Sequence, residues 1–197
     1  DAINIGAAMI SDDLDLMALG EMGIGNSTAG AALAARSFGG TAVDWVGPGT
    51  GVDDAGKQRK IAVIDKGLAT HDYAAKSAFE TLRRVGGREI AAMAGAILAA
   101  RMKSVPVLLD GFICCSAAAP LVADNPSITD HCIASHQSAE PHHGKMLDHL
   151  GLSPLLSLGM RLGEGSGAAV ATNLLRSAIM AHNQMATFAE AFVEAPQ

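Results

Sequence analysis

Short apolar runs recur along the chain and predict buried β-strands. Three of them are nearly continuous and end at glycine or at a polar residue, over residues 14–20, 105–111 and 128–136. A fourth candidate covers residues 155–159. Runs of this length without polar alternation are typical of parallel strands that are covered on both faces.

Segments with a helical pattern separate these runs. Asn26, Ser27 and Thr28 offer N-cap chemistry to the first segment, and the second carries acidic residues in its first turn. Strands that alternate with helices of this length indicate right-handed crossovers and a mainly parallel sheet, in which ligands bind at the carboxyl ends of the strands. The pattern therefore predicts an α/β fold. The expected helices cover residues 26–38, 53–69, 87–102, 111–123 and 165–185.

Composition and charge narrow this picture. A chain of 197 residues is long enough for one sizeable core. Alanine and glycine are abundant while aromatic residues make up only 4%, which favours helices that approach one another closely. A net charge of -6 and a pI near 5.6 argue against a nucleic-acid surface, which usually needs a basic face. Any phosphate ligand must therefore be held by a local cluster of cations.

The cysteines and the hydropathy of the chain indicate the cellular compartment in which we expect the protein. Cys114, Cys115 and Cys132 are an odd number without a framework spacing or a CxxC motif, which favours a reduced, cytoplasmic compartment. No apolar run reaches about 18 residues and the start carries no signal-peptide pattern, so we expect neither a membrane span nor a signal peptide. The first residue is Asp1 rather than methionine, which suggests a fragment or a processed chain.

The stretch 19–30 joins an apolar run to a helix through Glu21, Gly23 and Gly25. Glycines allow a close backbone approach, and exposed N–H groups at a helix start suit an anion or a ribose hydroxyl. A dinucleotide fingerprint is a second interpretation, with Asp44 at roughly the expected distance, although the glycine order is G-x-x-G-x-G. A plain turn with an N-cap is the third.

The stretch 47–60 combines Thr50 and the glycines around it, Gly47, Gly49 and Gly51, with nearby cations. A flexible backbone beside local positive charge suits a phosphate, although the G-K-[ST] ending of a P-loop is absent. Lys57 and Arg59 could equally belong to a solvated helix face, whereas Lys60 adjoins the apolar run.

Two further stretches carry polar side chains at strand ends. Asp110 directly follows one apolar run, where it either holds a ligand hydroxyl or braces a loop. Residues 134–145 contain a cluster that allows a metal site, a loop that braces the active site or a plain surface loop. Pro141 interrupts the cluster and no HExxH motif occurs, which counts against the metal. The members of the cluster are His136, Glu140, His142 and His143.

Glu164 stands among glycines between an apolar run and a long helix, the same placement as Glu21. Two carboxylates at strand ends could face one crevice, where a partly buried carboxylate near a like charge is suited to take a proton from a nitrogen nucleophile. Alternatively, Glu164 is an acidic residue at a helix start.

Several motifs in a fixed order together resemble the nicotinate-nucleotide:dimethylbenzimidazole phosphoribosyltransferase family. They are "GEMGIGNSTAGAALAA", "VGPGTGVDDAGKQRKIAVI", "EIAAMAGAILAA", "VPVLLDGF", "ASHQSAEPHH" and "LGMRLGEGSGAA", spread over nearly the whole chain. The resemblance implies a three-layer α/β/α fold with a mainly parallel, Rossmann-like sheet and a homodimer without metal or cofactor. Family members are usually longer at the N-terminus, so residues 1–197 are expected to form a single catalytic domain that lacks the family's N-terminal helical portion.

The resemblance also implies a reaction and residue roles. Phosphoribose would pass from nicotinate mononucleotide to 5,6-dimethylbenzimidazole with inversion, giving α-ribazole 5′-phosphate and nicotinate. Glu164 matches the general base and Glu21 a second carboxylate near the ribose, while Leu162 falls in the aromatic-base pocket. The motifs that hold the nucleotide contain Gly23, Gly49, Thr50, Gly51, Lys60 and Ser138, with Lys60 as the phosphate cation. A non-catalytic nucleotide-binding module and a dinucleotide-dependent oxidoreductase are the alternatives.

Overall fold

The computed structural model describes residues 1–49 and 51–193. Its described residues contain a four-stranded parallel sheet in the order β1-β2-β3-β4. Each predicted apolar run contains or overlaps one strand, and the predicted α/β class is confirmed. The strands are β1 (Met17–Leu19), β2 (Val107–Leu109), β3 (Cys132–His136) and β4 (Pro154–Leu156).

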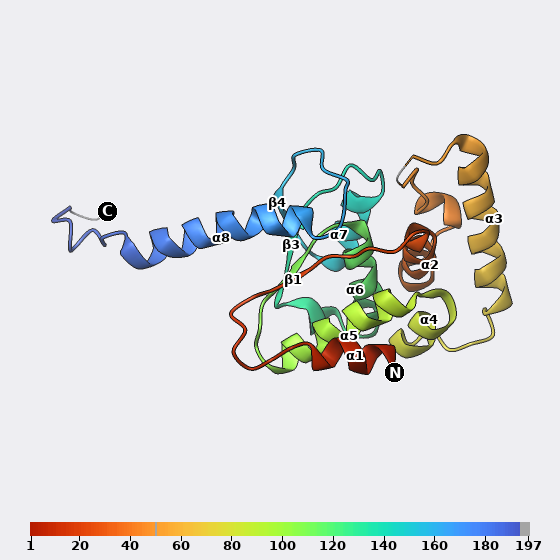
Figure 1. The fold of residues 1–197 in the computed structure, drawn as a ribbon, viewed down its shortest axis with the longest axis horizontal. Helices are drawn as coiled ribbons and strands as arrows, with labels where there is room; N and C mark the ends of the chain where they lie inside the picture. Colours follow the sequence, from red (N-terminus) through yellow and green to blue (C-terminus); the bar gives the residue numbers. More distant parts are fainter. Residues whose placement is uncertain (50, 194–197) are drawn as a thin grey trace.

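Most helices gather on one side of this sheet (Figure 1). The most central of them, α6, is buried from Phe112 to Val122, which explains its apolar sequence. The five predicted helices are present with ends shifted by no more than one residue. The helices are α1 (Ala2–Ala8), α2 (Asn26–Phe38), α3 (Asp54–Thr70), α4 (Ala78–Val85), α5 (Arg88–Met102), α6 (Phe112–Asp124), α7 (His143–Leu150) and α8 (Ser166–Gln184).

Small residues let α1 and α5 pack at short range. A Cβ atom on Gly6 would come within 2.9 Å of Ala92 Cα, and one on Gly95 would come within 2.9 Å of Ile3 Cα. Any larger residue at either position would push the two helices apart. This contact accounts for part of the high glycine and alanine content.

Helix α8 covers the other side of the sheet, which completes the three layers. Ala168 and Ala171 are fully buried and pack with Leu108 of β2. Beyond this contact α8 extends away from the body of the molecule (Figure 1), and Ile179 and Met180 on its outer half are exposed. None of the helices in the described residues is both long and apolar enough to cross a membrane.

Three local predictions were wrong or incomplete. The strand expected at 128–136 begins only at Cys132, because Pro126–Thr129 form the 3-10 helix η2, with the Asn125 side chain accepting from the backbone N–H of Ser127 at 3.2 Å. Helices α1, α4 and α7 were not predicted. The N-cap of α2 is Gly25 at φ +90°, and no side chain among the described residues caps this helix.

Candidate active site

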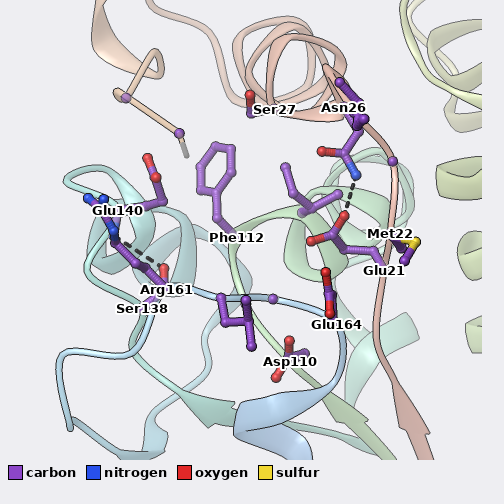
Figure 2. Close-up of a pocket in the computed structure, with 18 of the residues that line it drawn as sticks. Glu21, Met22, Asn26, Ser27, Asp110, Phe112, Ser138, Glu140, Arg161 and Glu164 are labelled. Carbon is purple, nitrogen blue, oxygen red and sulfur yellow. Dashed lines mark hydrogen bonds between the residues drawn. The ribbon is translucent and has the colours of Figure 1, made fainter. Parts of the chain in front are cut away.

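A pocket of about 220 Å³ opens at the carboxyl ends of the strands, where the α/β topology predicts a ligand site (Figure 2). One ordered water occupies about 30 Å³, so this volume has room for part of an organic ligand. Glu21 follows β1, Asp110 follows β2, Ser138 follows β3, and Glu164 precedes α8, and all four line the pocket. The pocket therefore gathers side chains from four loops of the sheet.

Glu164 occupies an unusual backbone conformation. Its φ is +58°, and its neighbours Gly163 and Gly165 have φ values of +78° and +77°. Glycine adopts this left-handed region at no steric cost, whereas a glutamate there is disfavoured by about 1–2 kcal/mol. The backbone N–H of Glu164 donates to the carbonyl oxygen of Glu21 at 3.1 Å, which holds the turn in place. Strained residues that are held in this way cluster at functional sites.

The loops that carry the two glutamates are in direct contact. A Cβ atom on Gly20 would lie 2.7 Å from Gly165 Cα, and one on Gly163 would lie 2.5 Å from Glu21 Oε1. A larger residue at Gly20 would collide with the backbone of the neighbouring loop, and one at Gly163 would displace the Glu21 carboxylate. The close approach of the two loops thus accounts for the glycines at these two positions.

Asp110 braces the loop before α8. One carboxylate oxygen accepts the N–H of Gly165 at 3.1 Å and the other accepts the N–H of Ala168 at 2.9 Å. The side chain is fully buried. Of the two roles considered for Asp110, the structure shows the brace. It also shows that Asp110, rather than Glu164, satisfies backbone donors at the start of α8.

Side chains at the start of α2 serve the pocket. The Asn26 amide donates to Glu21 Oε2 (Figure 2), and Lys60 Nζ donates to Ser27 Oγ at 2.9 Å. These contacts explain why the predicted capping by Asn26 and Ser27 is wrong: both side chains are engaged by residues outside the helix. Glu21 and Lys60 were predicted from the sequence, whereas the partners that orient them were not.

Lys60 borders the glycine loop that precedes α3. A Cβ atom on Gly49 would lie 3.1 Å from Lys60 Nζ, so the ammonium group lies directly against this loop. Gly49 lines the pocket, whereas Gly51, at φ +122°, does not contribute to its lining. Thr50 lies outside the described residues. Arg59 pairs with exposed Asp53 at 4.0 Å, as expected for a solvated helix face.

The histidine-rich segment braces the site. His143 is fully buried, and its Nδ1 accepts the backbone N–H of Ser138 at 2.8 Å. Its Nε2 lies 3.3 Å from Cys115 Sγ. His136 and Glu140 line the pocket, and His142 is the N-cap residue of α7. Within residues 1–49 and 51–193, no three His, Cys, Asp or Glu side chains converge as metal ligands. The bracing interpretation is therefore the one that the contacts support.

Apolar and aromatic side chains form the rest of the pocket wall. Phe112 opens α6 and stands in the middle of the view in Figure 2, and buried Trp45 also lines the pocket. Leu162, Met22 and Ile24 are largely exposed at the pocket. A flat aromatic ligand suits such a wall. Leu162 was predicted at this wall from the sequence, whereas Phe112 and Trp45 were not.

The cysteines do not supply a nucleophile. Burial raises the pKa of the Cys114 and Cys132 thiols to about 12 and that of Cys115 well above its usual range, so all three stay protonated at neutral pH. No cysteine lines the pocket in the described part of the chain. The groups with acid–base capacity that face the pocket are thus the carboxylates and His136. Burial lowers the pKa of His136, although nearby Asp110 acts in the opposite direction.

The sequence matches one family along nearly its whole length. The model of the phosphoribosyltransferase family DBI_PRT matches residues 1–193. The chain belongs to this family. The contacts of Asp44 do not support a dinucleotide fingerprint. Its carboxylate accepts hydrogen bonds from Thr41 N and Thr41 Oγ1 at 2.7 and 2.8 Å, and Asp44 does not line the pocket.

Individual relatives place the chain within the DBI_PRT family. It is 61% identical over 192 residues to the nicotinate-nucleotide–dimethylbenzimidazole phosphoribosyltransferase of Novosphingobium aromaticivorans, covering 98% of this chain and 57% of the relative. The protein of the same name from Brucella canis is 54% identical over 190 residues, covering 96% and 56%. The crystal structure of CobT from Thermus thermophilus superposes with a TM-score of 0.90 at 39% identity, covering 99% and 58%. The chain thus spans a little over half the length of these proteins.

Proposed function

We propose that this pocket transfers the phosphoribosyl group of nicotinate mononucleotide to 5,6-dimethylbenzimidazole, giving α-ribazole 5′-phosphate and nicotinate. The names of the relatives support this substrate pair. The observation that carries the proposal is the backbone hydrogen bond from Glu164 N to Glu21 O, because it brings two carboxylate residues to one pocket that also has apolar walls. Such a pocket suits a neutral aromatic nitrogen nucleophile and a cationic reaction centre.

In the proposed mechanism Glu164 is the general base. One benzimidazole nitrogen attacks the anomeric carbon from the face opposite nicotinate, and the bond from that carbon to the pyridinium nitrogen breaks. The bonding pair leaves with the pyridine ring, which becomes neutral at nitrogen, and the Glu164 carboxylate takes the proton from the other benzimidazole nitrogen. Attack from the opposite face inverts the anomeric carbon and gives the α-linked product.

Glu21 would act on the ribose. Its carboxylate, oriented by Asn26, can accept hydrogen bonds from ribose hydroxyls and stabilise positive charge at the anomeric carbon. Lys60, at the Gly49 loop, would hold the 5′-phosphate, and Ser138 and Gly23 would add contacts from their own loops. Because the pyridinium of the substrate is already a good leaving group, positioning and charge complementarity can supply most of the rate.

The Glu164→Gln variant tests this proposal. The amide keeps the shape of the side chain and cannot take a proton, so we expect nicotinate mononucleotide to bind as before while turnover falls by about 10²–10⁴-fold. Binding is measured through the fluorescence of Trp45, the single tryptophan, and product by chromatography. Glu190→Gln, at an exposed site outside the pocket, is the control. Near-normal turnover of Glu164→Gln would refute the base, and nucleotide binding without product in the parent protein would indicate a non-catalytic module.

We also propose that the protein acts as a homodimer in the cytoplasm. Leu174, Ile179 and Met180 of α8 are about half exposed, and a second copy that covers them would remove this apolar surface from water. The three cysteines are free and buried, which fits a reducing compartment. Light scattering after size exclusion measures the assembly, and a monomer at micromolar concentration would contradict the dimer.

A further inference from the structure

The charges around the pocket are strongly unequal. Its described lining contains four carboxylates and, among lysines and arginines, a single side chain, Arg161. The carboxylates belong to Glu21, Asp110, Glu140 and Glu164. An anionic group that enters the pocket is therefore repelled from most directions and attracted from one.

Arg161 is held at its place by the backbone. The neighbouring residue Met160 accepts the N–H of Ala139 at 2.9 Å, which ties the loop after β4 to the loop after β3. Arg161 consequently lies on the same side of the pocket as Ser138 and Glu140, whereas Glu21 and Glu164 lie on the other side (Figure 2). The tie between the loops thus fixes the main chain at Arg161 beside the pocket.

The guanidinium of Arg161 is available to a ligand. The side chain is exposed, and it takes part in none of the ion pairs found in residues 1–49 and 51–193. Lys60, in contrast, is already directed at the Gly49 loop by its bond to Ser27. Two separate cationic groups are thus present: Lys60 lies against the Gly49 loop without lining the pocket, and Arg161 lines the pocket on the loop before α8.

The proposed substrate has two separate anionic groups, a phosphate and a ring carboxylate. Resting on the proposed function, we infer that Arg161 pairs with the carboxylate of the nicotinate ring and so selects nicotinate mononucleotide over nicotinamide mononucleotide. A guanidinium donates two parallel hydrogen bonds to a carboxylate. A carboxamide offers one neutral oxygen and an NH₂ group that repels the same donors. The carboxylate is then also held as the ring leaves.

The test compares two nucleotides on three variants. Affinity for nicotinate mononucleotide and for nicotinamide mononucleotide is measured by Trp45 fluorescence and calorimetry. In Arg161→Gln we expect affinity for the nicotinate form to fall about ten- to hundredfold and affinity for the nicotinamide form to change less than about twofold. Arg161→Lys keeps the charge without the planar guanidinium, so its affinity for the nicotinate form should lie between that of the parent protein and that of Arg161→Gln. Arg176→Gln, an exposed arginine on α8 outside the pocket, is the control for loss of one charge.

The outcomes separate the possible roles. Equal weakening of both nucleotides in Arg161→Gln would show that Arg161 serves the phosphate, which overturns the inference. An unchanged ratio of affinities, or a parent protein without preference between the two nucleotides, overturns it as well. The proposed transfer reaction is scored separately by the formation of α-ribazole 5′-phosphate. Loss of that product with retained nicotinate selectivity would reject the reaction and keep the role of Arg161.

Discussion

The backbone N–H of Glu164 donates a hydrogen bond to the backbone carbonyl of Glu21 at 3.1 Å. This bond joins a loop near the start of the chain to one near its end. Because a main-chain bond leaves both side chains free, the two carboxylates remain available to a ligand in the same pocket. The left-handed conformations of Gly163 and Glu164 belong to the same turn as this bond.

Asp110 accepts two backbone hydrogen bonds from the segment that follows Glu164, so its replacement by asparagine should loosen the Glu164 turn. An Asn side chain keeps one acceptor and presents an NH₂ group to the other backbone N–H, which leaves a buried donor unsatisfied. We expect the free energy of unfolding to fall by about 1–3 kcal/mol. Under the proposed function, kcat should fall more than the affinity for nicotinate mononucleotide. Denaturant unfolding and steady-state kinetics measure the two effects.

Asp65→Asn, an exposed substitution on α3, is the control for Asp110→Asn and should leave both quantities unchanged. If Asp110→Asn unfolds at the same denaturant concentration as the parent protein, the brace contributes nothing to stability. If affinity for the nucleotide falls as much as kcat, the loop is not positioned for catalysis in the way that we describe.

The strands and five helices were predictable because the strands of a parallel sheet are buried on both faces, so each one is a short apolar run that separates the helical segments. Helix α7 was missed because its start, at His143, was interpreted as part of a loop of possible metal ligands. The side chain of His143 is buried by contact with Cys115, and this contact depends on the packing of α7 against α6. Such a tertiary contact leaves no periodic signal in the sequence.

The candidate site was predictable in part for a topological reason. Strand ends of a parallel sheet share one edge, so Glu21 and Glu164 were expected to face one crevice, and both line the pocket. Arg161, Phe112 and Trp45 were missed, because loop packing rather than spacing along the chain brings them there. The proposed roles of the two glutamates in catalysis stay predictions.

Gly167 lies against the ring of His136, and its replacement by alanine should deform the pocket wall. A Cβ atom there would lie 2.8 Å from His136 Cγ, closer than such contacts occur, and the buried ring has little room to move. We expect destabilisation of about 1–3 kcal/mol, as in other overpacked cores, with weaker nucleotide binding. Gly67→Ala, where the Cβ atom meets nothing within 4 Å inside α3, is the matched control and should stabilise by about 0.5–1 kcal/mol. Equal effects of the two substitutions on the unfolding midpoint would contradict this account.

His143 should make the fold sensitive to mild acid. Burial, with a smaller contribution from His136, lowers the pKa of His143 to about 4, whereas a histidine in an unfolded chain has a pKa of about 6.5. Protonation of Nδ1 would also remove the bond from Ser138 N. Between these two pKa values the unfolded chain binds more protons than the folded one, so the free energy of unfolding falls as the pH is lowered through this window. The contribution of His143 to stability is fully present above about pH 6.5.

Comparison with His143→Asn isolates this contribution from that of the other buried histidines. The Asn carbonyl oxygen can still accept from Ser138 N, but the side chain does not titrate. We therefore expect denaturant unfolding of His143→Asn to depend less steeply on pH between about 6.5 and 4, by close to one bound proton. His182→Asn, an exposed substitution on α8, should keep the parent slope. Parallel pH profiles of His143→Asn and the parent protein would mean that His143 binds its proton at the same pH in the folded and the unfolded chain. That result would contradict a pKa that burial holds low, and with it the bracing of Ser138 by a neutral ring.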